Sequence, residues 1–260
     1  MSSSLAPASF MIRVVSLATA FERRSHFSAS AAGTSLPWAF SDAHTACCEP
    51  LLNDAPAQLA RIGRPLGSAE IGCYSSHVSI WREFLDSDAK VLVVFEDDVV
   101  VDWRFVEHLL SFDLCKAGVM HLRLFNKVPC KYVLLASPFM GRYHHLIRNK
   151  KFALGTQAYV LTREGAGVLQ RHCRVIVRPI DVEIDRAWAH GVPSLTIVPS
   201  PVFERFVGST IGLERFEARR ASVRFHVYRL SEVLRRVLYN VRFALSPPDF
   251  VRKARGAPVH

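Results

Sequence analysis

Val91-Leu-Val-Val-Phe-Glu-Asp-Asp-Val-Val100 is the most informative stretch of this sequence. Five apolar residues, mostly β-branched, run without interruption into three adjacent acids. An unbroken apolar run of this length, preceded by the turn-forming Asp86-Ser-Asp88, predicts a strand that is covered on both faces in an α/β sheet. Ligands of open α/β sheets bind outside the carboxyl ends of the strands. The three acids are therefore predicted to lie where such a protein binds its ligand.

The acids Glu96, Asp97 and Asp98 suggest a cation site at this strand end. Three neighbouring carboxylates repel one another, and burying any of them without a partner is costly. Because side chains alternate along an extended chain, Glu96 and Asp98 are expected to point one way and Asp97 the other. Two carboxylates on one side form a hard-oxygen site suited to Mg²⁺ or Mn²⁺. The alternative is an acidic turn that is merely solvated.

Composition bounds the class of protein. The chain has 260 residues, of which 50% are hydrophobic and 22% are charged, so we expect a globular α/β domain, with or without a tail. The net charge is +10, and much of it is C-terminal: residues 213–260 hold 11 Arg and Lys against four Asp and Glu. We expect a flexible leader (1–10), a main α/β domain (11–212) and a basic helical tail (213–260).

The six cysteines do not predict a structural zinc site, because none forms a Cys-x-x-Cys pair or has a histidine at zinc-finger spacing. The first ten residues lack the basic start and apolar core of a secretory signal. No stretch approaches the ~18 consecutive apolar residues of a membrane span. We therefore expect an intracellular protein with reduced cysteines.

Other segments are assigned from local pattern. Residues 11–17 and 38–40 are predicted strands, and an amphipathic helix is expected to start at Ser68, which would act as its N-cap. Residues 44–67, rich in Pro and Gly, are predicted to be a long loop, and the basic stretch 126–151 an irregular, exposed segment. Two glycines in the helix expected at 163–171 suggest close packing on the sheet.

A second acid cluster lies in Arg178-Pro-Ile-Asp-Val-Glu-Ile-Asp185. Pro179 is expected to precede a helix, which would place Asp181 and Asp185 four residues apart on one face. Acids in the first turn of a helix also complement its dipole, so a purely structural role is the alternative.

The tail is predicted to be an amphipathic helix that is rich in arginine. Its apolar stripe contains Phe216, Val223, Val227, Leu230, Leu234, Val237, Leu238, Val241 and Leu245, and Pro247-Pro248 would end the helix. Arginines fill much of the remaining surface, so an anionic membrane surface is the favoured partner. A helix packed on its own domain is the alternative.

A series of motifs resembles glycosyltransferase family 25, the lipooligosaccharide galactosyltransferases and their collagen-glycosylating relatives. The motifs are, in order, Val15-Ser-Leu17 with Glu22-Arg23-Arg24, Phe40-Ser-Asp42-Ala43, Glu70-Ile-Gly-Cys-Tyr-Ser-Ser-His77, Phe95-Glu-Asp-Asp98, Gly155-Thr-Gln-Ala-Tyr159 with Gly165-Ala166, and Pro179-Ile-Asp181. The resemblance extends over residues 11–211. It implies a GT-A-like fold, with a single Rossmann-type mixed sheet flanked by helices, and a UDP-sugar donor, UDP-galactose or UDP-glucose, with inversion at the anomeric carbon.

The resemblance also implies roles for individual residues. Asp98, with Glu96, would bind Mn²⁺ or Mg²⁺, while Glu96 and Asp97 would position the nucleotide. Asp181 is the candidate base, with Glu183 and Asp185 behind it. The expected donor contacts are Arg23 and Arg24 to uridine or phosphate, Asp42 to the base or ribose, and His77 to the donor or the metal-bearing strand.

The expected function is transfer of a hexose to a lipid-linked or surface oligosaccharide, at the inner face of the bacterial inner membrane. Two alternatives belong to other classes. A phosphohydrolase on a doubly wound sheet would need an aspartate where Glu96 begins the acidic triplet. A basic nucleic-acid-binding protein would use residues 213–255, but the regular apolar stripe there indicates a packed or membrane-lying face, so no nucleic-acid partner is expected.

Overall fold

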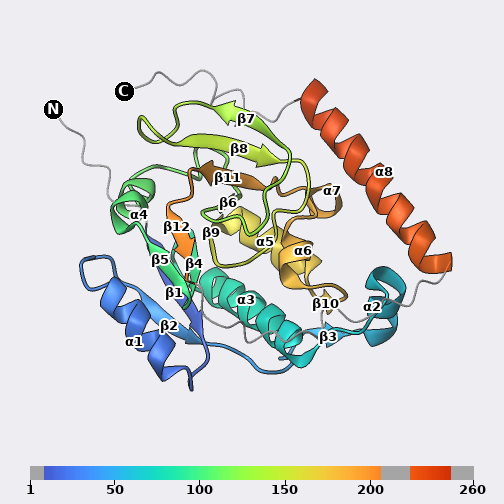
Figure 1. The fold of residues 1–260 in the computed structure, drawn as a ribbon, viewed down its shortest axis with the longest axis horizontal. Coiled ribbons are helices and arrows are strands. Elements are labelled where there is room, and N and C mark those ends of the chain that lie inside the picture. Colours follow the sequence, from blue (N-terminus) through green and yellow to red (C-terminus); the bar gives the residue numbers. More distant parts are fainter. Residues whose placement is uncertain (1–8, 206–222, 247–260) are drawn as a thin grey trace.

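The computed structural model describes residues 9–205 and 223–246. Its centre is one mixed sheet of eight strands in the order β2-β1-β4-β9-β6-β11-β8-β7, flanked by helices (Figure 1). The strands of this sheet are β1 (Phe10–Ser16), β2 (Ala39–Asp42), β4 (Val91–Glu96), β6 (His121–Arg123), β7 (Tyr132–Ala136), β8 (His145–Asn149), β9 (Ala158–Thr162) and β11 (Leu195–Val198). The predicted α/β architecture with a C-terminal helix is confirmed.

The sheet changes direction at its middle. β1 pairs in parallel with both β2 and β4, whereas β4 and β9 are antiparallel. Two small ribbons accompany the main sheet, β3 (Leu52–Asn53) with β10 (Val175–Ile176) and β5 (Val99–Val101) with β12 (Val202–Glu204). Because β9 runs against β4, the residues that enter β9 meet those that leave β1 and β4 at one edge.

The helices fill both faces of the sheet. They are α1 (Phe21–Ser30), α2 (Ala55–Ile62), α3 (Ser68–Asp86), α4 (Trp103–Leu110), α5 (Arg163–His172), α6 (Ile180–Ile184), α7 (Ala187–His190) and α8 (Val223–Leu245). Side chains of α3, α5 and α6 share one buried cluster, and those of α1 and α4 share the other. The helix α8 lies along one side of the molecule, with α2 near one of its ends (Figure 1).

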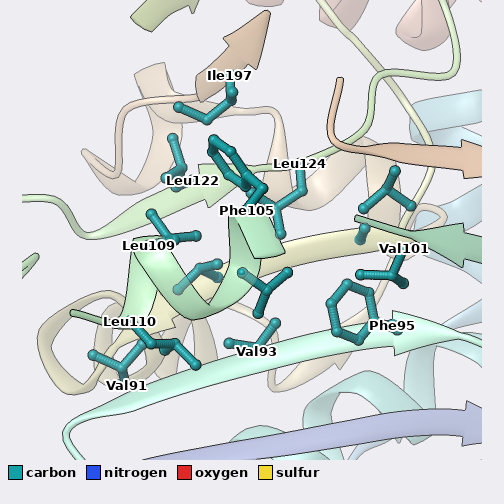
Figure 2. Packing of buried hydrophobic residues seen from close by; sticks show 14 of the residues in the cluster. Val91, Val93, Phe95, Val101, Phe105, Leu109, Leu110, Leu122, Leu124 and Ile197 are labelled. Carbon is teal, nitrogen blue, oxygen red and sulfur yellow. The ribbon is translucent and has the colours of Figure 1, made fainter. Parts of the chain in front are cut away.

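The run 91–95 supplies both clusters, as a strand buried on two faces should. Val91, Val93 and Phe95 face α4, as Figure 2 shows, and Leu92 and Val94 face α3 and α5. All five side chains are buried. The run has no alternating polar residues because both faces of this strand pack against apolar side chains.

Two glycines permit close approach between elements. A Cβ on Gly165 of α5 would lie 2.0 Å from the carbonyl oxygen of Met120, so the predicted close packing on the sheet is confirmed at this position. A Cβ on Gly72 of α3 would lie 2.3 Å from the carbonyl oxygen of His44. The neighbouring Ser76 hydroxyl accepts a hydrogen bond from the His44 amide (2.8 Å). The motif around Gly72 therefore anchors the loop that follows β2.

Three local predictions are wrong. Residues 44–67 contain β3 and α2, whose N-cap is Asp54, with Pro56 in the first turn. The stretch 126–151 contains the antiparallel pair β7 and β8, which closes one edge of the sheet. The N-cap of α3 is Gly67, one residue before the predicted Ser68, and the Glu70 carboxylate accepts a hydrogen bond from its amide.

The helix α8 packs on the domain through a polar and aromatic face. Glu232 pairs with Arg186 (2.8 Å) and accepts a hydrogen bond from the Trp188 indole. The buried Arg148 guanidinium lies 4.1 Å from the centroid of Phe243. One face of α8 packs on the domain, as the packed-helix alternative predicts. Another face is exposed and could contact a membrane. The leader up to residue 8, the 212/213 boundary and the proposed Pro247-Pro248 end of the helix lie outside the described residues.

In the two described ranges, every helix is too short or too polar to cross a membrane. All six cysteines lie within the first of these ranges, and all are free thiols.

Candidate active site

Three strand ends meet at one edge of the sheet and define the candidate site. The parallel registers place Val15 beside Glu96 and Ser16 beside Asp42. The acids that follow β4 and the residues that follow β1 therefore lie together, as predicted for an open α/β sheet. Helix α1 starts five residues after β1 and carries Arg23 and Arg24 in its first two turns. The predicted donor-binding residues 23, 24, 42 and 96–98 are thus brought together.

Glu96 is held by two buried groups. The Thr156 hydroxyl donates a hydrogen bond to its carboxylate (2.5 Å), and His77 Nε2 lies 3.8 Å from the same oxygen. Burial alone would raise the pKa of Glu96, but the contacts from His77 and Thr156 outweigh burial and lower it below the ordinary value. Glu96 is therefore charged at neutral pH.

His77 is fixed from behind by a buried hydroxyl. Its Nδ1 lies 2.8 Å from the Tyr159 hydroxyl, which also accepts a hydrogen bond from the Trp81 indole (2.9 Å). Because the Tyr159 hydroxyl accepts the indole N–H of Trp81, it can donate its own proton to Nδ1 of His77. That arrangement leaves Nε2 as the protonated nitrogen, facing Glu96. In the structure His77 supports the carboxyl end of β4, one of the two roles that the resemblance implied.

Arg23 joins the two remaining acids. Its guanidinium pairs with Asp97 and lies 3.0 Å from Asp98, and the Ser16 hydroxyl donates a hydrogen bond to Asp97 (2.6 Å). The expectation that Asp97 points away from its neighbours is wrong, because β4 ends at Glu96 and the following turn directs both aspartates toward Arg23. Burial raises the pKa of Asp97, and its bonds to Ser16 and Arg23 oppose that rise.

Asp98 is the least satisfied acid of the triplet. Burial and the nearby Glu96 carboxylate raise the pKa of Asp98 to about 7, against the pull of Arg23. Its Oδ1 atom is buried and has no hydrogen-bond partner among the described residues. Glu204 adds further negative charge, and its carboxylate is held by Lys127 (2.8 Å). The surroundings therefore favour a cation at Asp98.

The donor set fits an open site for a hard divalent cation. Among the described residues, there is no group of three or more His, Cys, Asp or Glu side chains close enough to bind one metal ion together. Asp98, with Glu96, can supply carboxylate oxygens, and the remaining ligands would come from phosphate and water, as is usual for Mg²⁺ sites of nucleotide enzymes. The unpartnered Oδ1 atom of Asp98 agrees with this interpretation.

Arg24 and Asp42 form a second polar group beside the triplet. The Arg24 guanidinium pairs with Asp42 and donates to the Ser16 carbonyl (2.9 Å), and it lies 4.8 Å from the centroid of the Phe40 ring. Asp42 itself is exposed. An exposed carboxylate flanked by an aromatic ring can bond a ribose hydroxyl or a base edge while the ring covers an apolar face.

The second acid cluster divides into one acid that is linked to the site through a backbone segment and two that stabilise the fold. Asp181 accepts hydrogen bonds from the Gly155 amide (3.1 Å) and the Val182 amide (2.8 Å). Gly155 adjoins Thr156, the partner of Glu96, so a single segment links Asp181 to the triplet. Burial raises the pKa of Asp181. The arrangement suits a group that accepts a proton.

Asp185 is saturated by its neighbours. It forms a buried ion pair with Arg123 (2.8 Å), and it accepts hydrogen bonds from the Ala153 and Leu154 amides and from Ser194. Arg123 in turn donates to the carbonyl oxygens of Leu154 and Gly155. Together, Arg123 and Asp185 hold the segment 153–155 by both its donors and its acceptors. We therefore assign Asp185 a positioning role and not that of the base.

Glu183 is likewise enclosed. It pairs with Arg178, Arg186 and His172, and although burial acts in the opposite direction these contacts lower its pKa far below the ordinary value. A carboxylate of such low basicity is a poor proton acceptor.

Several residues of the site escaped the sequence reasoning. Ser16, Thr156, Tyr159 and Glu204 contact or face the acids, yet none was predicted to do so. A signal existed for three of them, because Ser16 lies within the motif Val15-Ser-Leu17, and Thr156 and Tyr159 lie within Gly155-Thr-Gln-Ala-Tyr159. Glu204 offered no signal, since it reaches the site through the β5–β12 ribbon.

Comparison with known proteins agrees with this geometry. The sequence profile described as glycosyltransferase family 25 (LPS biosynthesis protein) matches residues 10–185. The chain belongs to glycosyltransferase family 25. The matched region contains every predicted site residue from Arg23 to Asp185, whereas Glu204 and α8 lie beyond it.

Curated relatives come from bacteria and animals. The chain is 36% identical over 167 residues to the lacto-N-neotetraose biosynthesis glycosyltransferase LgtB of Neisseria gonorrhoeae, and 30% identical over 163 residues to LgtE of Neisseria meningitidis serogroup B. Each match covers 58% of this chain and 56% of the relative, so the chain spans a little over half the length of these proteins. Procollagen galactosyltransferase 2 of Mus musculus is 41% identical over 56 residues, which are 21% of this chain and 9% of that protein.

Among solved structures, a glycosyltransferase involved in the glycosylation of the major capsid of PBCV-1 aligns with 63% of this chain and 65% of its own. The TM-score is 0.29 and the identity 10%, which is too distant a likeness to support an argument.

Proposed function

We propose that this protein transfers a hexose from a UDP-sugar to a hydroxyl group of a lipooligosaccharide or related surface glycan, in a metal-dependent reaction that inverts the anomeric carbon. Family membership supports glycosyl transfer, and the names of the bacterial and procollagen relatives support galactose before glucose. The observation that carries the metal and donor assignment is the buried, unpartnered Oδ1 atom of Asp98 at the carboxyl edge of the sheet. Family membership gives no support to the phosphohydrolase or nucleic-acid-binding alternatives.

In this proposal Asp98 and Glu96 hold Mn²⁺ or Mg²⁺ against the donor diphosphate. The bound ion would supply positive charge next to the phosphate oxygens as UDP departs. Arg23 already lies at the two aspartates and adds cationic charge for the same oxygens. Arg24, Phe40 and Asp42 would contact the nucleoside, and His77 holds Glu96 in place.

Asp181 is the proposed base. The acceptor oxygen attacks the anomeric carbon as the bond from that carbon to the UDP oxygen breaks, and the hydroxyl proton passes to the Asp181 carboxylate. Attack from the face opposite the leaving group inverts the configuration. A carboxylate whose pKa is raised by burial is a stronger proton acceptor than an ordinary aspartate, provided that the pH keeps it ionised.

Calorimetric titration with UDP-galactose tests this proposal. Binding is expected with Mn²⁺, and it should be lost with EDTA and in Asp98→Ala. A panel of other nucleotide sugars identifies the preferred donor, and NMR of the product reports the anomeric configuration. The proposal fails if no nucleotide sugar binds with any divalent ion, and the inverting assignment fails if the configuration is retained.

We also propose that α8 binds an anionic membrane surface, which would place the protein on the inner face of the bacterial inner membrane. Its outward side exposes eight aliphatic residues at helical spacing, namely Val223, Val227, Leu230, Leu234, Val237, Leu238, Val241 and Leu245. Leu230 and Leu245 are 72% and 80% exposed. The only acid of α8, Glu232, is already paired with Arg186. An apolar face on a helix with several arginines and a single acid suits insertion into acidic lipid headgroups.

Vesicle sedimentation tests the membrane assignment. The protein should bind vesicles that contain phosphatidylglycerol, and binding to phosphatidylcholine alone should be much weaker. Leu230→Ser combined with Leu238→Ser should abolish binding, whereas Val100→Ser, which changes an exposed aliphatic residue on β5, should not. Equal binding by both variants would refute a role for α8.

A further inference from the structure

A cavity lies between part of α8 and the rest of the domain. Its volume is about 420 Å³, and it is bounded by residues of α2, α6, α7 and α8 and by the segment 152–154. Figure 1 shows these elements gathered on the side where α8 lies. The volume falls within the range of small-molecule sites, roughly 300–1,000 Å³.

The cavity is rich in arginine whose charge is not balanced by acids. Arg61, Arg229 and Arg236 line it, and none of the three forms an ion pair with a described carboxylate. Arg178 and Arg186 also line it but are paired with Glu183. The one acid in the lining, Glu232, is engaged by Arg186 and Trp188. The cavity therefore favours an anion.

The three arginines without an ion pair to a described carboxylate lie over aromatic rings, and the guanidinium of Arg229 is 5.4 Å from the centroid of Phe225. The guanidinium of Arg236 lies 5.7 Å from the centroid of Trp188 and 5.8 Å from that of Phe152, and Arg61 lies 5.8 Å from that of Tyr228. A guanidinium stacked by its face keeps its N–H edge for phosphate or carboxylate oxygens. Rings such as Trp188 offer apolar faces for the C–H groups of a sugar. Arginine and aromatic side chains together suit an acidic saccharide better than a bare ion.

The cavity adjoins the proposed base. Leu154 lines it, and the next residue, Gly155, donates its amide to Asp181. Pro179 and Val182, on either side of Asp181 in the sequence, also belong to the lining. The wall contributed by α8 lies outside the family match, which ends at residue 185.

We propose that this cavity binds a phosphate- or carboxylate-bearing sugar unit of the acceptor, next to the unit whose hydroxyl is glycosylated. The inference rests on the proposed glycosyl transfer and names the acceptor class for the same site. Arg61, Arg229 and Arg236 bind the acid group, and Trp188 with Phe152 covers the ring. The acceptor is thus an anionic glycan.

Calorimetry with small probes tests the assignment. Glucose 6-phosphate and glucuronate should bind the full chain at least about tenfold more tightly than methyl glucoside, because charge-assisted hydrogen bonds to arginine are lost in the neutral sugar. Arg61→Gln combined with Arg236→Gln should weaken both acidic sugars by at least about tenfold. Arg104→Gln, an exposed arginine of α4, is the matched control and should change nothing. If the double variant does not fold, Arg236→Gln alone should weaken binding by about threefold or more.

Other outcomes would overturn the inference. Equal affinity for methyl glucoside removes the case for an acid group, and equal affinity for inorganic phosphate removes the case for a sugar. UDP-galactose binding with Mn²⁺, measured on the same samples, separates the two proposals. Donor binding without acidic-sugar binding refutes only the cavity assignment. Acidic-sugar binding without binding of any nucleotide sugar refutes the proposed function, and the acceptor role with it.

Discussion

The two acid clusters look alike in the sequence and differ in the structure. After β4, the buried Oδ1 atom of Asp98 lacks a partner among the described residues, and three nearby acids outweigh the single guanidinium of Arg23. Around α6, Glu183 and Asp185 are neutralised by arginines and by backbone amides. The first cluster has negative charge that is not fully compensated and can bind a cation, whereas the charges of the second cluster stabilise the fold. Only Asp181 of the second cluster is linked to the site, through the adjacent residues Gly155 and Thr156.

The largest expected effect is on catalysis at the first cluster. Asp98→Asn should lower transfer by about a thousandfold, because loss of a metal site removes several kcal/mol of transition-state stabilisation. The free energy of unfolding should change by less than about 1 kcal/mol, because relief of the repulsion from Glu96, Asp97 and Glu204 offsets the lost attraction to Arg23. Transfer assays and urea unfolding on one preparation check both expectations. A large loss of stability would contradict the contrast between the clusters.

The second cluster should respond in the opposite way. Asp185→Asn should lower the free energy of unfolding by about 3–5 kcal/mol, because it leaves the buried Arg123 without a counter-charge. Urea unfolding measures the change. Asp88→Asn, at an exposed position in the turn before β4, is the matched control and should alter stability by less than about 0.5 kcal/mol. Equal stability of the two variants would remove the assigned positioning role.

Asp181 sharpens the comparison because it belongs to the second cluster and is the proposed base. Asp181→Asn should slow transfer by about a hundredfold while leaving UDP-sugar affinity unchanged, as expected for loss of a general base. Because burial raises the pKa of Asp181, the wild-type rate should fall with acid at a pH above the ordinary aspartate value. A rate loss caused only by weaker donor binding would identify Asp181 as a donor contact instead.

The smallest effect concerns acid stability near the second cluster. Burial lowers the pKa of His190 to about 3, helped by the charge of the neighbouring His172. Its Nε2 donates to carbonyls of α6, and its Nδ1 accepts from the Val192 amide, so only the neutral ring fits. The unfolded state binds the proton first, so stability is full above about pH 6.5 and falls as the pH drops toward about 3.

Urea titrations at pH 7.5 and 5.5 measure this loss, which should be about 1 kcal/mol. His190→Gln, whose side-chain amide can still donate to the same carbonyls and does not titrate, should lose less between the two pH values. An identical pH dependence in the variant would show that another group is responsible.

The central strand, its acids and the family motifs were predictable because they rest on local pattern. An apolar run without alternation can only be buried on both faces, and acids at its end must meet ligands or water. The pair β7–β8 could not be found in this way, since its edge position depends on β11, nearly 50 residues away. Helix α2 was not predicted because the prolines and glycines of 44–67 together indicate a loop, although proline is common in the first turn of a helix.

The two roles within the second acid cluster also lay beyond the sequence. Asp181 and Asp185 are four residues apart in the sequence, and this spacing does not show whether a ligand or an arginine contacts each of them. Arg123 decides the role of Asp185, and it arrives from β6, 62 residues earlier in the chain. The exposure of the aliphatic side of α8 was equally undetermined, because a stripe at helical spacing describes a packed helix and a membrane-lying helix equally well.

The Arg123–Asp185 pair also limits how the sequence can drift. A lineage that loses one partner must pass through a protein with an uncompensated buried charge, so most single changes would be removed by selection. The two positions should therefore change together: descendants are expected to keep both charges, exchange them, or become neutral at both. An alignment of the family can reveal this correlated substitution without any protein being made. A family member with aspartate at the position of Asp185 but an apolar residue at the position of Arg123 would have to hold the segment equivalent to 153–155 by other contacts.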